Sequence, residues 1–390
     1  KAVEELLDIE VNYYAKVKEN SFFSTTKGYT YTDGTIAKFS NENSYRYFKV
    51  EPVKWKVLTT NYNGKALLLA EDILTANVPY YEDYQNNRTV DGKTVYPIIF
   101  PVNYSNMGSI NCYIYQNGNE YTLIDAGIKG EEFEQFFYQK LSDYRIEMKQ
   151  IKRIILTHFH EDHTGLVNKL AKDYSIPVYA SQIAITRLKC EGDYLQQKLT
   201  FYQELYIQYG VTNFAAERLA KMENTLRNKE KVMLQPPIFL LEEGQQIGGL
   251  QVIAVPGHSP DSIGLFDKDN GWLFAGDFLL ASGMTGALID HDEAGEILNP
   301  LMQYIESIEK VRTYSIQYVF SGHEAIFQNL DEVIEKSLSK TEYKLQKLVK
   351  KVSEGHHTAQ AIGEAIYGVR FAKHFTFIIS EIIGLILLAQ

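Results

Sequence analysis

The sequence is poor in cysteine, and its two cysteines, Cys112 and Cys190, cannot build a disulfide framework. Neither cysteine lies in a metal-type motif, so we expect two plain thiols. A Gly-x-Ser-x-Gly nucleophile elbow is also lacking, so the sequence predicts no serine nucleophile of that kind. Positive charge is outweighed by negative charge. The net charge of −10 argues against a broad surface for binding polyanions.

Long apolar runs are missing as well. The final segment, residues 375–390, is apolar but short and contains Glu381, whereas a membrane span needs about 20 apolar residues. We therefore expect no membrane span and interpret this segment as a packing helix or a homodimer surface. No signal peptide is visible, and the chain begins at Lys1 rather than Met. We expect a cytoplasmic protein whose natural start precedes Lys1.

The 390 residues predict two or three domains, and a hydrophobic content of 45% is ample for a core. Residues 1–95 contain no histidine, and they are rich in Tyr, Thr and Asn after a helix-like apolar spacing over 3–17. The sequence TNYNG (60–64) predicts a hairpin turn between two apolar runs. We predict a small β-rich module of unknown role over residues 1–97, with a junction near Tyr96–Pro101.

Ligand-type side chains directly follow the apolar run Ile154-Ile155-Leu156, which predicts a buried strand. Three of the nine histidines of the chain lie in the next segment, THFHEDHTG (157–165). Imidazoles and carboxylates at a strand end need something that offsets their desolvation. A divalent ion does this, and such ligands suit zinc or iron. A polar loop with chance histidines is the disfavoured alternative. The predicted ligands here are His158, His160, Asp162 and His163.

Three later segments repeat this arrangement, because in each an apolar strand ends and a ligand-type side chain follows at once. Recurrence of the context makes a chance match of the first motif improbable. The segments are PGHSPDSIG with His258, LFAGDFLL with Asp277, and YVFSGHE with His323.

This ordered set of motifs resembles the metallo-β-lactamase superfamily, from about residue 98 to about residue 330. The resemblance implies an α/β fold, the four-layer αββα sandwich, and a site for two divalent ions. One ion would be bound by His158, His160 and His258. The other would be bound by Asp162, His163 and His323, with Asp277 bridging the two.

Further roles follow from the same resemblance. Asp125 in TLIDAG (122–127), together with Thr157, would orient a ligand imidazole from behind. Asp162 would pass a proton to the leaving group, and Asp277 would hold the metals together. Antibiotic-degrading members often have Cys where Asp277 stands, and the flavodiiron branch usually has Glu where His160 stands, so we expect neither of these branches.

The resemblance implies a dinuclear zinc hydrolase of the glyoxalase II-like or lactonase-like branch, with iron or manganese as the alternative metals. A metal-bridging hydroxide would attack a small-molecule ester, thioester or lactone. Two alternatives stay open: a nuclease acting on RNA or another phosphodiester, and an iron-dependent sulfur dioxygenase. A row of lysines over 340–351 favours nucleic acid locally, whereas the net charge opposes it. The sequence does not name the substrate.

The domain prediction places the hydrolase at 98–330, with a helical insert at 182–232 and a helical tail at 331–390 that resembles the start of a winged helix. The insert is either a surface helical hairpin or a lid over the metal site. In the lid interpretation, its tyrosines would contact substrate, and these are Tyr202, Tyr206 and Tyr209. The motif W-x-V-L…LLLAE around Trp55 resembles an uncharacterised module of bacterial surface proteins, which predicts a bacterial origin.

Overall fold

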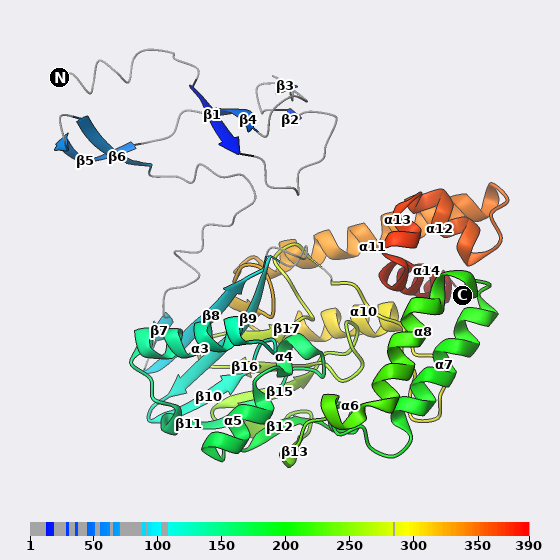
Figure 1. The fold of residues 1–390 in the computed structure, drawn as a ribbon, viewed down its shortest axis with the longest axis horizontal. Coiled ribbons are helices and arrows are strands. Elements are labelled where there is room, and N and C mark those ends of the chain that lie inside the picture. The colour runs from blue at the N-terminus through cyan, green and yellow to red at the C-terminus, as the bar shows by residue number, and fades with distance from the viewer. Residues whose placement is uncertain are drawn as a thin grey trace. The chain divides into compact units, whose positions relative to one another are not determined.

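The computed structural model describes residues 88–90, 92–102, 108–283 and 285–389 in full, and six strands before them by their backbone only. The chain divides into two compact units, Lys1–Tyr80 and Tyr81–Gln390 (Figure 1). The first unit contains β1 (Tyr13–Lys18), β2 (Tyr29–Thr30), β3 (Ile36–Ala37), β4 (Tyr45–Val50), β5 (Trp55–Tyr62) and β6 (Lys65–Ala70).

The strands of the first unit form three antiparallel pairs, β1 with β4, β2 with β3, and β5 with β6. Tyr62 pairs with Lys65, so the hairpin predicted at 60–64 is confirmed. The helix-like spacing of 3–17 is misleading in its last part, because Tyr13–Lys18 is a strand. The earlier part of that segment lies outside the described residues.

The second unit contains two β-sheets. The first has seven strands in the order β13-β12-β11-β10-β9-β8-β7, antiparallel from β7 to β10 and parallel from β10 to β13. Its strands are β7 (Arg88–Val90), β8 (Lys93–Pro101), β9 (Ser109–Asn117), β10 (Glu120–Ile124), β11 (Ile151–Ile155), β12 (Val178–Ser181) and β13 (Ile238–Leu241).

The second sheet has five strands in the order β14-β15-β16-β17-β18, antiparallel except for the parallel pair β17 and β18. Its strands are β14 (Gln246–Ile247), β15 (Leu250–Ala254), β16 (Ile263–Asp267), β17 (Trp272–Gly276) and β18 (Tyr318–Ser321). Strands β16 and β17 are buried along their whole length, because both of their faces are covered.

The two sheets and the helices on their outer faces form four layers. A core that includes Tyr115, Trp272 and Phe320 fills the space between the sheets. Helices α3 (Glu131–Tyr144) and α5 (Val167–Tyr174) pack on the outer face of the first sheet. Helices α10 (Pro300–Val311) and α11 (Leu330–Ser353) pack on the outer face of the second. The predicted αββα sandwich is therefore confirmed.

The insert and the tail are helical, as predicted, and they share one apolar core. No described residue after α11 forms a strand, so the tail lacks the hairpin of a winged helix up to residue 389. No helix in the described part of the chain is long and apolar enough to cross a membrane. The helices are α6 (Gln182–Leu188), α7 (Tyr194–Gln208), α8 (Thr212–Arg227), α9 (Lys229–Val232), α12 (Ala359–Tyr367), α13 (Arg370–Lys373) and α14 (Phe375–Ala389).

The predicted boundary at 97/98 and the junction near Tyr96–Pro101 are wrong. Strand β8 runs unbroken from Lys93 to Pro101 and pairs with β9 along its whole length. Strand β7 precedes it, with Val90 opposite Lys93 and Gly92 at a φ of 79°. The dipeptide Asp91-Gly92 between them is a hairpin signal that favours a two-residue turn. Lys93 also contacts Asp267 at 2.8 Å, so this edge is tied to the second sheet.

This arrangement predicts different outcomes for two N-terminal deletions. Removal of residues 1–80 should leave the melting temperature of the second unit unchanged, because no strand of its sheets is lost. Removal of residues 1–95 deletes β7 and the start of β8, and it leaves the buried Asp267 carboxylate without the Lys93 ammonium, a loss of about 3 kcal/mol of stability. Thermal melts and urea titrations of both truncations measure the difference. Equal stability of the two would contradict the assigned edge.

Candidate metal centre

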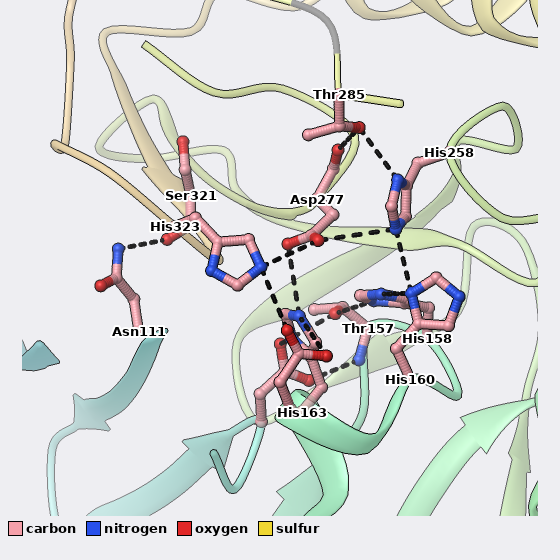
Figure 2. Close-up of polar contacts among 12 residues, drawn as sticks. Asn111, Thr157, His158, His160, His163, His258, Asp277, Thr285, Ser321 and His323 are labelled. Atoms are coloured by element: carbon pink, nitrogen blue, oxygen red, sulfur yellow. Dashed lines mark hydrogen bonds and ion pairs between the residues drawn. The ribbon is translucent and has the colours of Figure 1, made fainter. Parts of the chain in front are cut away.

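All seven predicted ligands follow the C-terminal end of a strand, and the structure brings them together (Figure 2). His158 and His160 follow β11, and the short helix α4 (Glu161–Thr164) carries the next two ligands. The others follow β15, β17 and β18. Three groups of ligand atoms each lie within 4.8 Å of one another, and two of them coincide with the predicted triads: His158 with His160 and His258, and Asp162 with His163 and His323. The third group joins the two triads, because it consists of His158, His163 and Asp277.

The first triad points three ring nitrogens at one position. His158 Nε2 lies 3.0 Å from His160 Nδ1, and His258 Nε2 lies 3.1 Å from the same atom. His258 Nδ1 faces the carbonyl oxygen of Gly286 at 3.1 Å, and a carbonyl can only accept a hydrogen bond. His258 therefore carries its proton on Nδ1, and the lone pair of Nε2 points inward. His158 has the same arrangement, because the Thr157 hydroxyl donates its own proton to Asp125 Oδ2 and so accepts from His158 Nδ1 at 3.1 Å.

The second triad is held in the same way. His163 Nδ1 lies 2.8 Å from Asp125 Oδ2, and His323 Nδ1 lies 2.7 Å from the carbonyl oxygen of Ser109. Both rings thus present Nε2 to the centre, where carboxylate oxygens also converge. His163 Nε2 is 3.3 Å from Asp277 Oδ1, and His323 Nε2 is 3.1 Å from Asp277 Oδ2 and 3.4 Å from Asp162 Oδ2.

The electrostatics of the triads differ. Burial lowers the pKa of His158 and His258, and it lowers the pKa of His160 to about 3. Burial acts against the charge of His323 as well, but Asp277 and Asp162 outweigh it and raise the pKa of His323 to about 10. The pKa of His163 is raised well above its usual value for the same reason. The first triad therefore consists of neutral imidazoles, whereas the second attracts positive charge.

The donor set fits two cations. Within the described part of the chain, the buried atoms His163 Nε2, His323 Nε2 and Asp277 Oδ1 make no hydrogen bond. Buried polar atoms without partners are costly, and they mark a position where an ion or ligand is bound. The Asp162 and Asp277 carboxylates repel each other unless positive charge lies between them. Imidazole and carboxylate ligands in sets of three suit zinc, with iron or manganese as alternatives.

Two glycines allow this close approach. A Cβ atom on Gly322 would lie 2.3 Å from Asp277 Oδ1 and 2.7 Å from His163 Cε1, so no other residue fits beside the carboxylate. Gly276, just before Asp277, has a φ of 51°, and a Cβ there would lie 2.5 Å from Thr157 Oγ1. The glycines of the Gly-Asp and Gly-His motifs are therefore required sterically.

Asp125 and Thr157 lie behind the ligands, and Asp125 contacts His163 rather than the first histidines. The Thr157 hydroxyl donates to Asp125 Oδ2 at 2.8 Å, and the Thr157 backbone N–H donates to Asp125 Oδ1 at 2.8 Å. Asp125 has a φ of 58°, a left-handed conformation that Asp tolerates better than most residues. This carboxylate therefore fixes both the end of β11 and the His163 ring.

Some positioning groups were not predicted from the sequence. The Asn111 side chain donates to the carbonyl oxygens of Ser321 at 2.9 Å and Glu324 at 3.0 Å, so it fixes the loop that carries His323 (Figure 2). Asn111 is a buried amide between the apolar residues Ile110 and Cys112 of β9, a weak signal of such a role. Thr285 lies 3.0 Å from His258 Nδ1 and donates to the Asp277 carbonyl oxygen at 2.6 Å. No motif marks Thr285.

The tyrosines of the insert do not all lie where a lid would need them. Tyr202 and Tyr206 are 2% and 1% exposed, and their rings lie in the core between the insert and α14. The ring centroids of Tyr206 and Phe375 are 5.4 Å apart. Their expected position at an entrance is wrong, because the helical hairpin needs large apolar groups on its inner face. The Tyr202 hydroxyl instead donates to the carbonyl oxygen of Ile289. Tyr209 is half-buried.

Comparisons with known proteins agree with the fold and the motifs. A family model described as "Metallo-beta-lactamase superfamily" matches residues 106–323. The probable metallo-hydrolase YqjP of Bacillus subtilis is 24% identical over 284 residues, which cover 71% of this chain and 86% of YqjP. An atrochrysone carboxyl ACP thioesterase of Aspergillus fumigatus is 21% identical over 255 residues, 65% of this chain and 63% of that protein.

Solved structures show the same fold. The crystal structure of a metallo-beta-lactamase family protein from Thermus thermophilus superposes with a TM-score of 0.58 at 19% identity, covering 75% of this chain and 91% of that one.

The buried position of Tyr202 predicts a structural effect of Tyr202→Phe. The substitution leaves the Ile289 carbonyl oxygen without its donor, so the free energy of unfolding should fall by about 1–3 kcal/mol. Tyr209→Phe is the matched control, because the Tyr209 hydroxyl makes no hydrogen bond to any described residue, and it should change stability by less than about 0.5 kcal/mol. Urea denaturation measures both. Equal effects of the two substitutions would count against the assigned hydrogen bond.

Proposed function

Because this chain belongs to the metallo-beta-lactamase superfamily and is a metallo-hydrolase of that family, we propose that it uses two divalent ions to hydrolyse a small ester, thioester or lactone. The observation that supports this proposal best is the inward convergence of the two triads. Five imidazole nitrogens and two carboxylates face one another at the ends of four strands, and three of these buried atoms have no hydrogen-bond partner among the residues that the structure describes.

The residues have distinct proposed roles. His158, His160 and His258 would hold one ion, because they are neutral and their lone pairs converge. Asp162, His163 and His323 would hold the other. Asp277 would bridge both, since its two carboxylate oxygens face different histidines, Oδ1 toward His163 at 3.3 Å and Oδ2 toward His258 at 3.5 Å.

Two such ions, when bound, supply Lewis acidity and lower the pKa of water to near neutrality. The chain supplies orientation and proton transfer. Asp162 is the proposed proton carrier to the leaving group, because its side chain is partly exposed at 21% whereas that of Asp277 is 6% exposed. The Asp162 carboxylate is also ionised in this environment, since His163 and His323 outweigh its burial and lower its pKa.

The substrate class is supported by one relative and by the charge of the tail. The Aspergillus fumigatus relative is named as a thioesterase, which favours a thioester. The lysine row of α11 gives little support to the nuclease alternative, because several of its members already have partners. Lys340 donates to the Ser282 carbonyl oxygen at 2.8 Å, Lys344 contacts Glu381 at 2.5 Å, and Lys351 contacts Glu354 at 2.6 Å.

A panel of a thioester, a lactone, a phosphodiester and RNA tests the proposed reaction. We expect turnover of the thioester or the lactone. Treatment with a chelator should abolish this turnover, because it removes the ions from the ligand side chains, and addition of zinc should restore it. Cleavage of RNA or the phosphodiester with no turnover of the first two would contradict the proposal and favour a nuclease.

The proposed bridging role of Asp277 predicts metal loss in Asp277→Ala. Elemental analysis should find about two divalent ions per wild-type chain. The variant should lose most of its metal and its activity while its circular dichroism spectrum is unchanged. Asp331→Ala removes an exposed carboxylate from α11 and serves as the control that should retain both ions. An Asp277→Ala variant that kept two ions and full turnover would contradict the bridging role of Asp277.

A further inference from the structure

One loop connects the candidate metal centre to the C-terminal tail. The Gly286 carbonyl oxygen in this loop faces His258 Nδ1 at 3.1 Å, and the residue before it, Thr285, links His258 to Asp277 (Figure 2). Further along the loop, the Arg187 guanidinium of α6 donates to Asp290 Oδ2 at 3.0 Å, and both side chains are buried. The loop is therefore fixed from the metal side and from the insert.

Phe377 of α14 lies against this loop from the tail. A methyl group built on Gly286 would be 3.5 Å from Phe377 Cδ1, which is ordinary van der Waals contact. Gly286 and the His258 imidazole thus lie between the Phe377 ring and the inward-facing Nε2 of His258. The helix behind the ring is firmly seated, because Phe375 and Ile379 are 6% and 1% exposed.

The exposure of Phe377 is unusual for its position. Its side chain is 60% exposed, although α14 also contributes seven buried residues to the fold. Neither the sandwich nor the insert needs this ring for packing. Because Phe377 lies next to the loop that holds His258, an apolar ligand group that covered its ring would gain free energy from the burial of apolar surface.

We infer that Phe377 is a substrate-positioning residue that contacts an apolar acyl group of the substrate. This inference rests on the proposed function and narrows its substrate class: the scissile carbonyl would lie at the metal centre and an acyl chain of several carbons would extend past Gly286 onto the Phe377 ring. Acetyl groups are too short to reach the ring, so they gain nothing from it. Preference for longer chains would then come from the tail rather than from the metal ligands.

A series of acyl N-acetylcysteamine thioesters of two, four, six and eight carbons tests the inference. Each methylene that becomes fully buried contributes up to about fourfold to kcat/KM. For Phe377→Ala we expect a decrease of about tenfold in kcat/KM for the octanoyl thioester, mainly through KM, and a change of less than about twofold for the acetyl thioester. Phe377→Leu should restore most of the preference. Melting temperature and metal content should be unchanged in both variants.

Phe239→Ala is the matched control, because Phe239 is 50% exposed on β13 at the edge of the first sheet. It should leave the chain-length profile intact. Calorimetric titration with octanoate and acetate provides a readout without turnover: wild type should bind octanoate more tightly than acetate, and Phe377→Ala should lose that difference.

The outcomes separate the two claims. Tighter octanoate binding that depends on residue 377, together with no hydrolysis of any thioester or lactone, would retain the role of Phe377 and refute the proposed function. Hydrolysis with the same chain-length profile in wild type and Phe377→Ala would refute the role of Phe377 and retain the proposed function. Wild type that neither binds octanoate more tightly than acetate nor discriminates by chain length would also overturn the role of Phe377.

Discussion

The structure depends on one electrostatic constraint, the convergence of imidazole lone pairs and carboxylates in a buried space. Four histidines have their Nδ1 atoms engaged by acceptors behind them, which directs Nε2 inward. Such an arrangement is unfavourable without cations, because His163 Nε2, His323 Nε2 and Asp277 Oδ1 are buried and have no hydrogen-bond partner among the described residues. The fold opposes this repulsion by fixing every ligand at a strand end.

The surrounding elements explain how that position is held. The two sheets pack through a shared aromatic core, so the ends of β11, β15, β17 and β18 are brought to one edge. Asn111 joins the sheets directly at the loop of His323. The insert and the tail form a separate apolar core that supports the loop behind His258. We thus propose that metal ligation depends on the sandwich, whereas substrate selection depends on the helical tail.

The sequence predicted the ligand cluster well and its surroundings only in part. Closely spaced histidines after an apolar strand can be recognised locally, and Asp277 and His323 recur in the same context. The partners of His258 and His323 could not be predicted, because carbonyl groups such as Gly286 and Ser109 have no side-chain signature. The lid interpretation placed Tyr202 at an entrance because the insert lies between two ligand motifs in the chain, and position in the chain alone does not say which neighbour covers a helix face.

Strand β7 shows a different limit. A strand of three residues is too short to show a periodic pattern, and only the dipeptide Asp91-Gly92 indicates a hairpin there.

Anomalous diffraction from crystals of the metal-loaded protein, collected at the metal absorption edge, is the direct test of the proposed two-metal centre. We expect two peaks roughly 3.5–4 Å apart, one at each triad, with Asp277 between them. A single peak, or none, with the seven side chains still in place would contradict it.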